Sequence, residues 1–320
     1  MDGREVMKSY ILIILLYCFF CPVYSYEFKK VTVLSDRVTP RHGPFGVYQS
    51  VMNGLRILKI PFNCNPQTSQ VGDAIIVLSG VDNLRKAIDW KRNGRIKCLF
   101  GGPNIMNRPN QFNYLLASKE VDVCLVPSQW IKVAYEEDAP ALKGRVQYWP
   151  AGVDVNDWSP GAMNRDCVLV YWKTEGMQLC QKVEELLRKF GYKPVRITYN
   201  SYDMSTYKNV LNKSKFAVFI SRSESQGIAL AEAWSMNVPT LAFDPGQLTY
   251  LGRSYFPVSS CPYLTEYTGK TWKHLEELET LIQNFDSYAA QFDSRKWVLK
   301  HMSYEASTRA LLASIESVYH

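Results

Sequence analysis

The 320-residue chain contains few of the side chains that build metal and redox centres. It has only 4 histidines, and its single Cys-x-x-Cys pair, Cys18 and Cys21, falls in an apolar N-terminal segment. No Asp-x-Asp pair occurs. Since zinc and redox sites need clustered Cys and His ligands, the sequence indicates neither kind of centre.

Basic runs and low-complexity tracts are also missing. The 37 Lys and Arg residues exceed the 30 Asp and Glu residues, for a net charge of +7, but no basic run has interleaved aromatic residues. The sequence therefore gives no indication of nucleic-acid binding. A mild positive charge suits anionic ligands or an anionic membrane surface. With 47% apolar and 21% charged residues, the chain is typical of a globular protein, and its length suits two domains.

One continuous apolar segment, residues 10–24, precedes the globular part. It is short for a membrane span and has the length of a signal-peptide core. Arg4 and Lys8 on one side balance Lys29 and Lys30 on the other, so the flanking charges do not choose among a cleaved signal, an uncleaved anchor and an apolar arm lying on the membrane.

We expect a membrane-associated protein whose folded part lies on the cytoplasmic side. Cys98, Cys124 and Cys167 lie in or beside strand-like apolar runs, where a free thiol behaves as a small hydrophobic group. Asn212 is the only glycosylation acceptor sequence. If residues 1–25 were a cleaved signal peptide, the secretory compartment would be the alternative.

From residue 31 onward, short apolar runs alternate with helical stretches, which predicts parallel sheets in doubly wound form. The predicted strands are residues 31–34, 74–78, 97–100, 121–126, 146–149, 167–172, 195–199, 216–220 and 238–243, with a weaker one at 60–64. The main predicted helices are residues 48–58, 177–190, 207–211 and 272–284. The tail, residues 294–318, continues as an amphipathic helix according to the apolar spacing from Ala306 to Val318.

A polar turn and a helix follow the apolar run 216–220 and carry Glu224, Gly227 and Glu232. Open α/β sheets bind ligands at this edge, and Gly227 lets a phosphate approach the free N–H groups of a helix start. Glu232 shares the inward face of Ile228, where ribose hydroxyls would satisfy its carboxylate. The spacing favours a sugar-nucleotide site. The alternative places Glu224 at the positive helix end and Glu232 in solvent.

Residues 221–240 resemble the signature of the family 4 retaining glycosyltransferases, Glu-x-Phe-Gly-x4-Glu followed by Ala-x4-Val-Pro. Gln226 stands where the family usually has Phe, and Asn237 where it usually has Gly. Residues 126–160 are similar to the domain junction of the same family: a strand ending in Ser, a helix, a short strand, and then Gly152, Val153, Asp154, Trp158 and Pro160.

The resemblance implies the α/β GT-B fold, with two Rossmann-like doubly wound domains facing a central cleft. Residues 1–26 would be the apolar signal or anchor, and residues 27–155 the acceptor-side domain. Residues 156–300 would bind the nucleotide sugar, and residues 301–320 would form a closing helix that returns to the N-terminal domain. The implied reaction transfers a sugar from a nucleotide-diphosphate sugar to a hydroxyl of a glycan, lipid or protein acceptor, with retention of anomeric configuration and without a metal or other cofactor.

The resemblance also implies roles for single residues. Glu224 would bind sugar hydroxyls and Glu232 the ribose, while Lys173 would neutralise the diphosphate. The remaining implied donor-site residues are Gly46, in a glycine-rich loop at residues 39–46, and Ser225, Gln226, Gly227 and Ile228. His42, in the same loop, is a candidate for the acceptor-side base, and the turn at residues 101–104 is a candidate for lining the acceptor cleft.

Interpretations without a functional role stay open for several of these residues. Lys173 would otherwise be a solvated surface lysine, His42 polar surface, and residues 39–46 an ordinary turn. Two other functions also stay open: a sugar-nucleotide epimerase or phosphorylase of the same fold, and a non-catalytic module that binds a glycan or partner.

Overall fold

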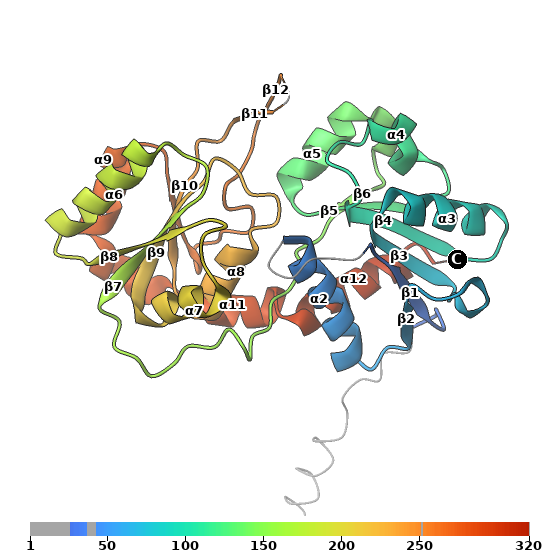
Figure 1. Ribbon diagram of the computed structural model, residues 1–320, viewed down its shortest axis with the longest axis horizontal. Coiled ribbons are helices and arrows are strands. Elements are labelled where there is room, and N and C mark those ends of the chain that lie inside the picture. Colours follow the sequence, from blue (N-terminus) through green and yellow to red (C-terminus); the bar gives the residue numbers. More distant parts are fainter. Residues whose placement is uncertain (1–25, 37–42, 251, 320) are drawn as a thin grey trace, which may run out of the picture.

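The computed structural model describes residues 26–36, 43–250 and 252–319, which form two α/β domains side by side (Figure 1). The N-terminal domain contains a parallel sheet of order β2-β1-β3-β4-β5-β6. Its strands are β1 (Val31–Leu34), β2 (Phe62–Cys64), β3 (Ala74–Ser79), β4 (Cys98–Asn104), β5 (Val123–Val126) and β6 (Val146–Tyr148). The strand order reverses at β1, which has β2 on one side and β3 on the other, as in doubly wound sheets.

The C-terminal domain repeats this design with a parallel sheet of order β13-β10-β9-β7-β8. Its strands are β7 (Cys167–Trp172), β8 (Pro194–Thr198), β9 (Ser214–Ile220), β10 (Thr240–Phe243) and β13 (Gly269–Trp272). A short antiparallel hairpin, β11 (Leu248–Tyr250) and β12 (Arg253–Tyr255), projects from it. The order reverses between β7 and β9, which places a ligand-binding crevice at the carboxyl ends of these two strands.

Helices cover both faces of each sheet, so the inner strands such as β1, β3 and β5 are buried on both faces. The N-terminal domain has α2 (Gly43–Ile57), α3 (Val81–Arg92), α4 (Gln111–Tyr114) and α5 (Gln129–Asp138). The helices that follow are α6 (Met177–Lys189), α7 (Met204–Lys213), α8 (Ile228–Ser235), α9 (Leu275–Gln283), α10 (Phe285–Tyr288), α11 (Ser294–His301) and α12 (Tyr304–Glu316). Four short 3-10 turns lie at Thr68–Gln70, Leu115–Ala117, Pro140–Leu142 and Ala289–Gln291.

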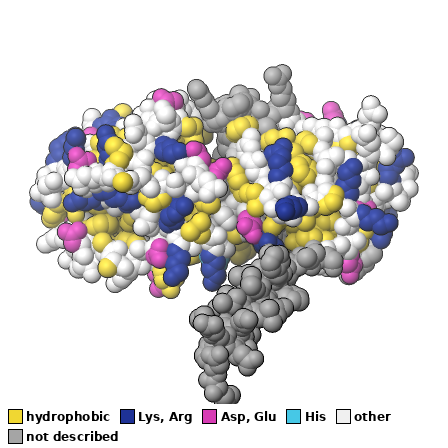
Figure 2. Space-filling model, turned by 90° about the horizontal axis from the view of Figure 1, so that it is seen from below, with side chains coloured by type: hydrophobic (Ala, Val, Ile, Leu, Met, Phe, Trp, Pro, Cys, Tyr) yellow, Lys and Arg dark blue, Asp and Glu magenta, His cyan; other side chains and the backbone are white. Residues whose placement is uncertain are grey.

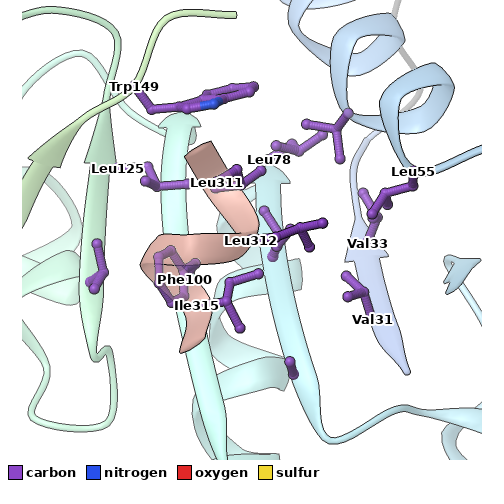
Figure 3. Close-up of a cluster of buried hydrophobic side chains, with 14 of the residues drawn as sticks. Val31, Val33, Leu55, Leu78, Phe100, Leu125, Trp149, Leu311, Leu312 and Ile315 are labelled. Atoms are coloured by element: carbon purple, nitrogen blue, oxygen red, sulfur yellow. The ribbon is translucent and has the colours of Figure 1, made fainter. Parts of the chain in front are cut away.

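The last helix, α12, packs in the N-terminal domain although it follows the C-terminal domain in sequence (Figures 1 and 3). Leu311, Leu312 and Ile315 lie among the side chains of β1, β3, β4 and β5. Full burial of each such side chain contributes about 2 kcal/mol relative to exposure. A Cβ at Gly54 of α2 would come within 1.8 Å of Thr308 Oγ1, so the close approach of α2 and α12 requires glycine there.

The two chain segments that connect the domains lie together. Val153 forms a parallel bridge with Ser303, and its N–H donates to the carbonyl of Met302 at 2.8 Å. The Ser303 hydroxyl accepts from the N–H of Ala306 and caps α12. The amphipathic helix predicted for the tail corresponds to α12, and the chain breaks between α11 and α12, where Ser303 pairs with Val153.

The predicted strands are found with small shifts of their ends. Residues 101–104, predicted as a turn, instead lie inside β4, where a Cβ at Gly102 would meet the carbonyl of Leu125. Cys98, Cys124 and Cys167 are buried and unpaired, as predicted. The predicted domain boundaries after residues 26, 155 and 300 stay predictions.

Charge is distributed over both domains. Figure 2 shows Lys and Arg side chains spread across the face seen from below, among acidic and hydrophobic side chains. Within the described residues, every helix is too short or too polar to cross a bilayer. The apolar segment at residues 10–24 lies outside the described residues.

Candidate functional site

A cavity of about 560 Å³ lies between the two domains, at the carboxyl ends of β7 and β9. This volume is within the range of small-molecule sites. The C-terminal domain supplies most of the wall, and the N-terminal domain contributes the first turn of α2 and Tyr304 of α12.

Lys173 and Glu224 form an ion pair in this cavity. Trp172 and Ile220 end β7 and β9 as paired residues, so the segments that follow them leave the sheet next to each other. Lys173 Nζ lies 2.8 and 2.9 Å from the two carboxylate oxygens of Glu224. Their side chains are 20% and 14% exposed, so the pair is only partly solvated and interacts more strongly than a surface pair.

The start of α8 faces the same cavity. Gly227 has the left-handed backbone conformation, with φ of 69°, and among the described residues no side chain caps the helix. The first N–H groups of a helix lack partners within it and carry partial positive charge. Gly227 and Ile228 line the cavity, so this helix start places partial positive charge on its wall, beside the Lys173–Glu224 pair.

Glu232 is the most strongly perturbed acid of the cavity. Its side chain lies on the inner face of α8, and the residue is 7% exposed. Burial, together with the negative charge of Asp157, raises its pKa to about 8. The interpretation that placed Glu232 in solvent is therefore wrong. A carboxyl group held in this way can exchange hydrogen bonds with the hydroxyl groups of a ligand.

The N-terminal domain approaches this wall through Gly46. A Cβ at Gly46 would lie 2.5 Å from Ile228 Cδ1, so the first turn of α2 lies close against the start of α8. The sequence placed Gly46 in a loop, but the structure places it inside α2, which begins at Gly43. Of the predicted loop 39–46, residues 39–42 lie outside the described residues.

The structure thus brings the described members of the predicted site together in one cavity. They are Gly46, Lys173, Glu224, Ser225, Gln226, Gly227, Ile228 and Glu232. His42 lies outside the described residues, and its role stays a prediction. Across the described residues, no group of three or more His, Cys, Asp or Glu side chains is arranged to hold a metal ion.

Sequence analysis missed an aromatic wall of the cavity. Tyr199 and Tyr202 follow the carboxyl end of β8, next to Tyr171 on β7. Lys173 Nζ lies 4.5 Å from the ring centre of Tyr199, and Tyr171 stacks on Phe219. The rule that parallel strands present their following residues at one edge could have identified Tyr199 and Tyr202.

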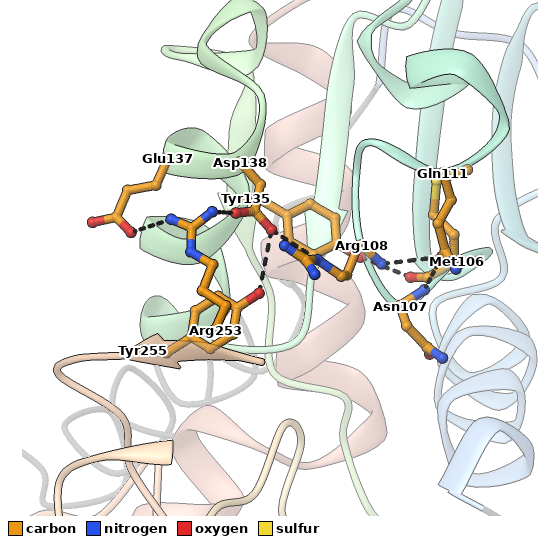
Figure 4. Close-up of polar contacts among 9 residues, drawn as sticks. All are labelled: Met106, Asn107, Arg108, Gln111, Tyr135, Glu137, Asp138, Arg253 and Tyr255. Carbon is orange, nitrogen blue, oxygen red and sulfur yellow. Dashed lines mark hydrogen bonds and ion pairs between the residues drawn. The ribbon is translucent and has the colours of Figure 1, made fainter. Parts of the chain in front are cut away.

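A second missed feature is a polar contact that joins the domains (Figure 4). Asp138 at the end of α5 has a side chain that is 3% exposed and forms an ion pair with Arg253 of the β11–β12 hairpin. Arg108 Nε lies 3.2 Å from the same carboxylate, and the Tyr255 hydroxyl donates to it at 3.4 Å. Trp130 Nε1 also donates to the carbonyl of Glu224 at 2.8 Å, so these contacts link the wall of the cavity to α5.

Comparison with solved structures shows the same fold in several glycosyltransferases. The apo form of the lipopolysaccharide outer core galactosyltransferase WaaB matches with a TM-score of 0.56 and 12% identity over 90% of this chain and 99% of its own. AviGT4, a glycosyltransferase involved in avilamycin A biosynthesis, matches with a TM-score of 0.52 and 8% identity over 91% of this chain and 98% of its own. Sucrose-phosphate synthase from Thermosynechococcus elongatus matches with a TM-score of 0.50 and 10% identity over 91% of this chain and 99% of its own.

The chain therefore has the GT-B fold, with two Rossmann-like domains, as the sequence resemblance predicted. No protein-family model matches the sequence, and no curated protein matches it either.

Proposed function

We propose that this protein is a glycosyltransferase that moves a sugar from a nucleotide-diphosphate sugar to an acceptor hydroxyl, with retention of anomeric configuration. The observation that carries the proposal is the convergence of the Lys173–Glu224 pair and the uncapped start of α8 at the point where the strand order reverses. Galactosyl transfer by WaaB and glycosyl transfer by AviGT4 support the same reaction class.

The chemical difficulty of this reaction is the negative charge that develops on the departing diphosphate. Fixed positive groups aimed at that charge stabilise it without reorganisation. The N–H groups at the start of α8 and the ammonium of Lys173 would fill this role, since both lie on the cavity wall. Because these groups supply the positive charge, the proposed reaction requires no metal ion or other cofactor.

The two glutamates would position the donor. Glu224 accepts hydrogen bonds from the sugar while its charge stays paired with Lys173, which fixes the direction of the carboxylate. Glu232 lies deeper, where ribose hydroxyls would satisfy its buried carboxyl group. The rings of Tyr199 and Tyr202 offer an aromatic surface for the base. The starch synthase IV structure, which shares this fold, contains bound ADP.

A glycan, lipid or protein hydroxyl would enter from the N-terminal domain, where the first turn of α2 lines the cavity. His42, the residue immediately before Gly43 at the start of α2, stays the candidate for the acceptor-side base. We further propose that residues 10–24 hold the protein at a membrane, with the folded part in the cytoplasm, where sugar nucleotides are made.

One experiment separates this function from its alternatives. The purified chain is incubated with UDP-glucose, UDP-galactose, UDP-N-acetylglucosamine, GDP-mannose or ADP-glucose, with and without an acceptor extract, and nucleoside diphosphate release is measured. Transfer predicts release that the acceptor accelerates. An epimerase would change the sugar without release, and a binding module would do neither; either result would reject the proposal.

A further inference from the structure

Gln226 carries a polar group that no other described residue satisfies. The residue stands between Glu224 and the start of α8, lines the cavity and is 7% exposed. Neither Nε2 nor Oε1 has a hydrogen-bond partner among the described residues. Enclosing a carboxamide without partners is unfavourable, and an apolar side chain would fill the same place without that penalty. Such a group in a cavity wall indicates a ligand that completes its hydrogen bonds.

The chemistry of a carboxamide narrows the ligand group. Gln226 offers two N–H donors and a carbonyl acceptor on one neutral plane. A phosphate presents only acceptors, so it would leave Oε1 unpaired, and Lys173 and the start of α8 already suit its charge. Neighbouring sugar hydroxyls both donate and accept, and they match both sides of the amide. Both polar atoms of the amide are closed off from solvent in the structure, so contact with a sugar in the cavity requires a change of side-chain rotamer.

We propose that Gln226 determines which sugar the enzyme transfers, by hydrogen-bonding hydroxyl groups of the donor sugar beside Glu224. This inference rests on the proposed function. It distinguishes Gln226 from Glu232 and Lys173, which act on the nucleotide part of the donor. The amide would favour the sugar whose hydroxyls lie in the direction of its donor and acceptor, and would disfavour the epimer that leaves one side unpaired.

The test compares Gln226→Leu with wild type. Leucine keeps most of the volume and removes both polar atoms. We expect kcat/KM for the preferred donor to fall about tenfold or more, and its ratio to that of the epimeric donor to shrink toward unity, because the discriminating hydrogen bonds are lost. Binding of the nucleoside diphosphate alone, measured by calorimetry, should change less than about twofold. The Tm without ligand should stay level or rise.

Ser128→Ala is the matched control. Ser128 lies in the N-terminal domain, and its buried Oγ likewise lacks a partner among the described residues. Removing it tests the loss of an unsatisfied polar atom outside the proposed sugar contact, so donor preference should not change.

The outcomes separate the inference from the proposed function. If wild type releases nucleoside diphosphate and Gln226→Leu keeps the same donor preference, the inference is wrong and the proposed function stands. A lower Tm of Gln226→Leu together with weaker nucleoside diphosphate binding would also overturn the inference, because it would show that Gln226 has a structural role. If wild type acts on no donor in the panel, both fail.

Discussion

Glu232 should make the free energy of unfolding of this protein depend on pH, and a single substitution should remove that dependence. Its pKa rises from the usual 4.5 to about 8 in the folded protein because the side chain is buried on the inner face of α8, near Asp157. The unfolded chain releases this proton near pH 4.5, while the folded chain holds it until about pH 8. The folded state thus binds more protons in that interval, and the free energy of unfolding falls as pH rises.

The magnitude follows from the same interval. The contribution of Glu232 to the free energy of unfolding is fully present below pH 4.5. It falls by about 1.4 kcal/mol per pH unit above that, so up to about 5 kcal/mol is lost by pH 8. Glu232→Gln keeps the volume of the side chain and cannot ionise. We therefore expect the variant to match wild type near pH 4.5 and to be more stable by about 2 kcal/mol at pH 6 and by up to about 5 kcal/mol above pH 8.

Urea unfolding of both proteins at intervals between pH 5 and pH 9 measures this difference without any substrate. Glu185→Gln is the matched control, since Glu185 is exposed on α6 and its replacement should not produce a difference that grows with pH. Parallel curves for wild type and Glu232→Gln across the whole range would refute the reasoning, because they would show that folding does not change the ionisation of this carboxyl group.

Three further outcomes test the proposed site and the placement of the protein. Glu224→Gln removes the charge that faces Lys173, so sugar transfer should fall by about a hundredfold or more in a steady-state assay, while circular dichroism stays unchanged. Equal turnover in this variant and wild type would reject that role. Transfer should persist in excess EDTA, because α8 and Lys173 supply the positive charge; a complete loss that Mg²⁺ or Mn²⁺ restores would contradict this. A chain without residues 1–26 should be soluble and bind nucleotide like the full chain, whereas the full chain should sediment with membranes on cell fractionation. A mature chain starting near Tyr26, with a glycan on Asn212, would instead indicate secretion.

Much of the fold could be predicted because its signals are local. Short apolar runs such as residues 74–78 and 167–172 are buried on both faces of a parallel sheet, and the alternation with helices follows from that burial. Gly227 was recognisable at a helix start because it follows a polar turn at the end of an apolar strand, and the structure gives it the left-handed backbone that glycine adopts freely. The end of a helix was harder to predict, as the break between α11 and α12 shows, since it depends on pairing with the distant Val153.

The sequence by itself therefore determined the doubly wound class of the fold and the chain segment that carries Glu224, Gly227 and Glu232. Only the tertiary structure decided that Lys173 pairs with Glu224, which lies 51 positions later in the chain, and that α2 is the helix against which the closing helix α12 packs. It also decided that Glu232 is buried with a raised pKa. The physical reason is range: hydrophobic periodicity and backbone geometry act within one element, whereas charge pairing and desolvation depend on which distant surfaces the packing of two domains brings together.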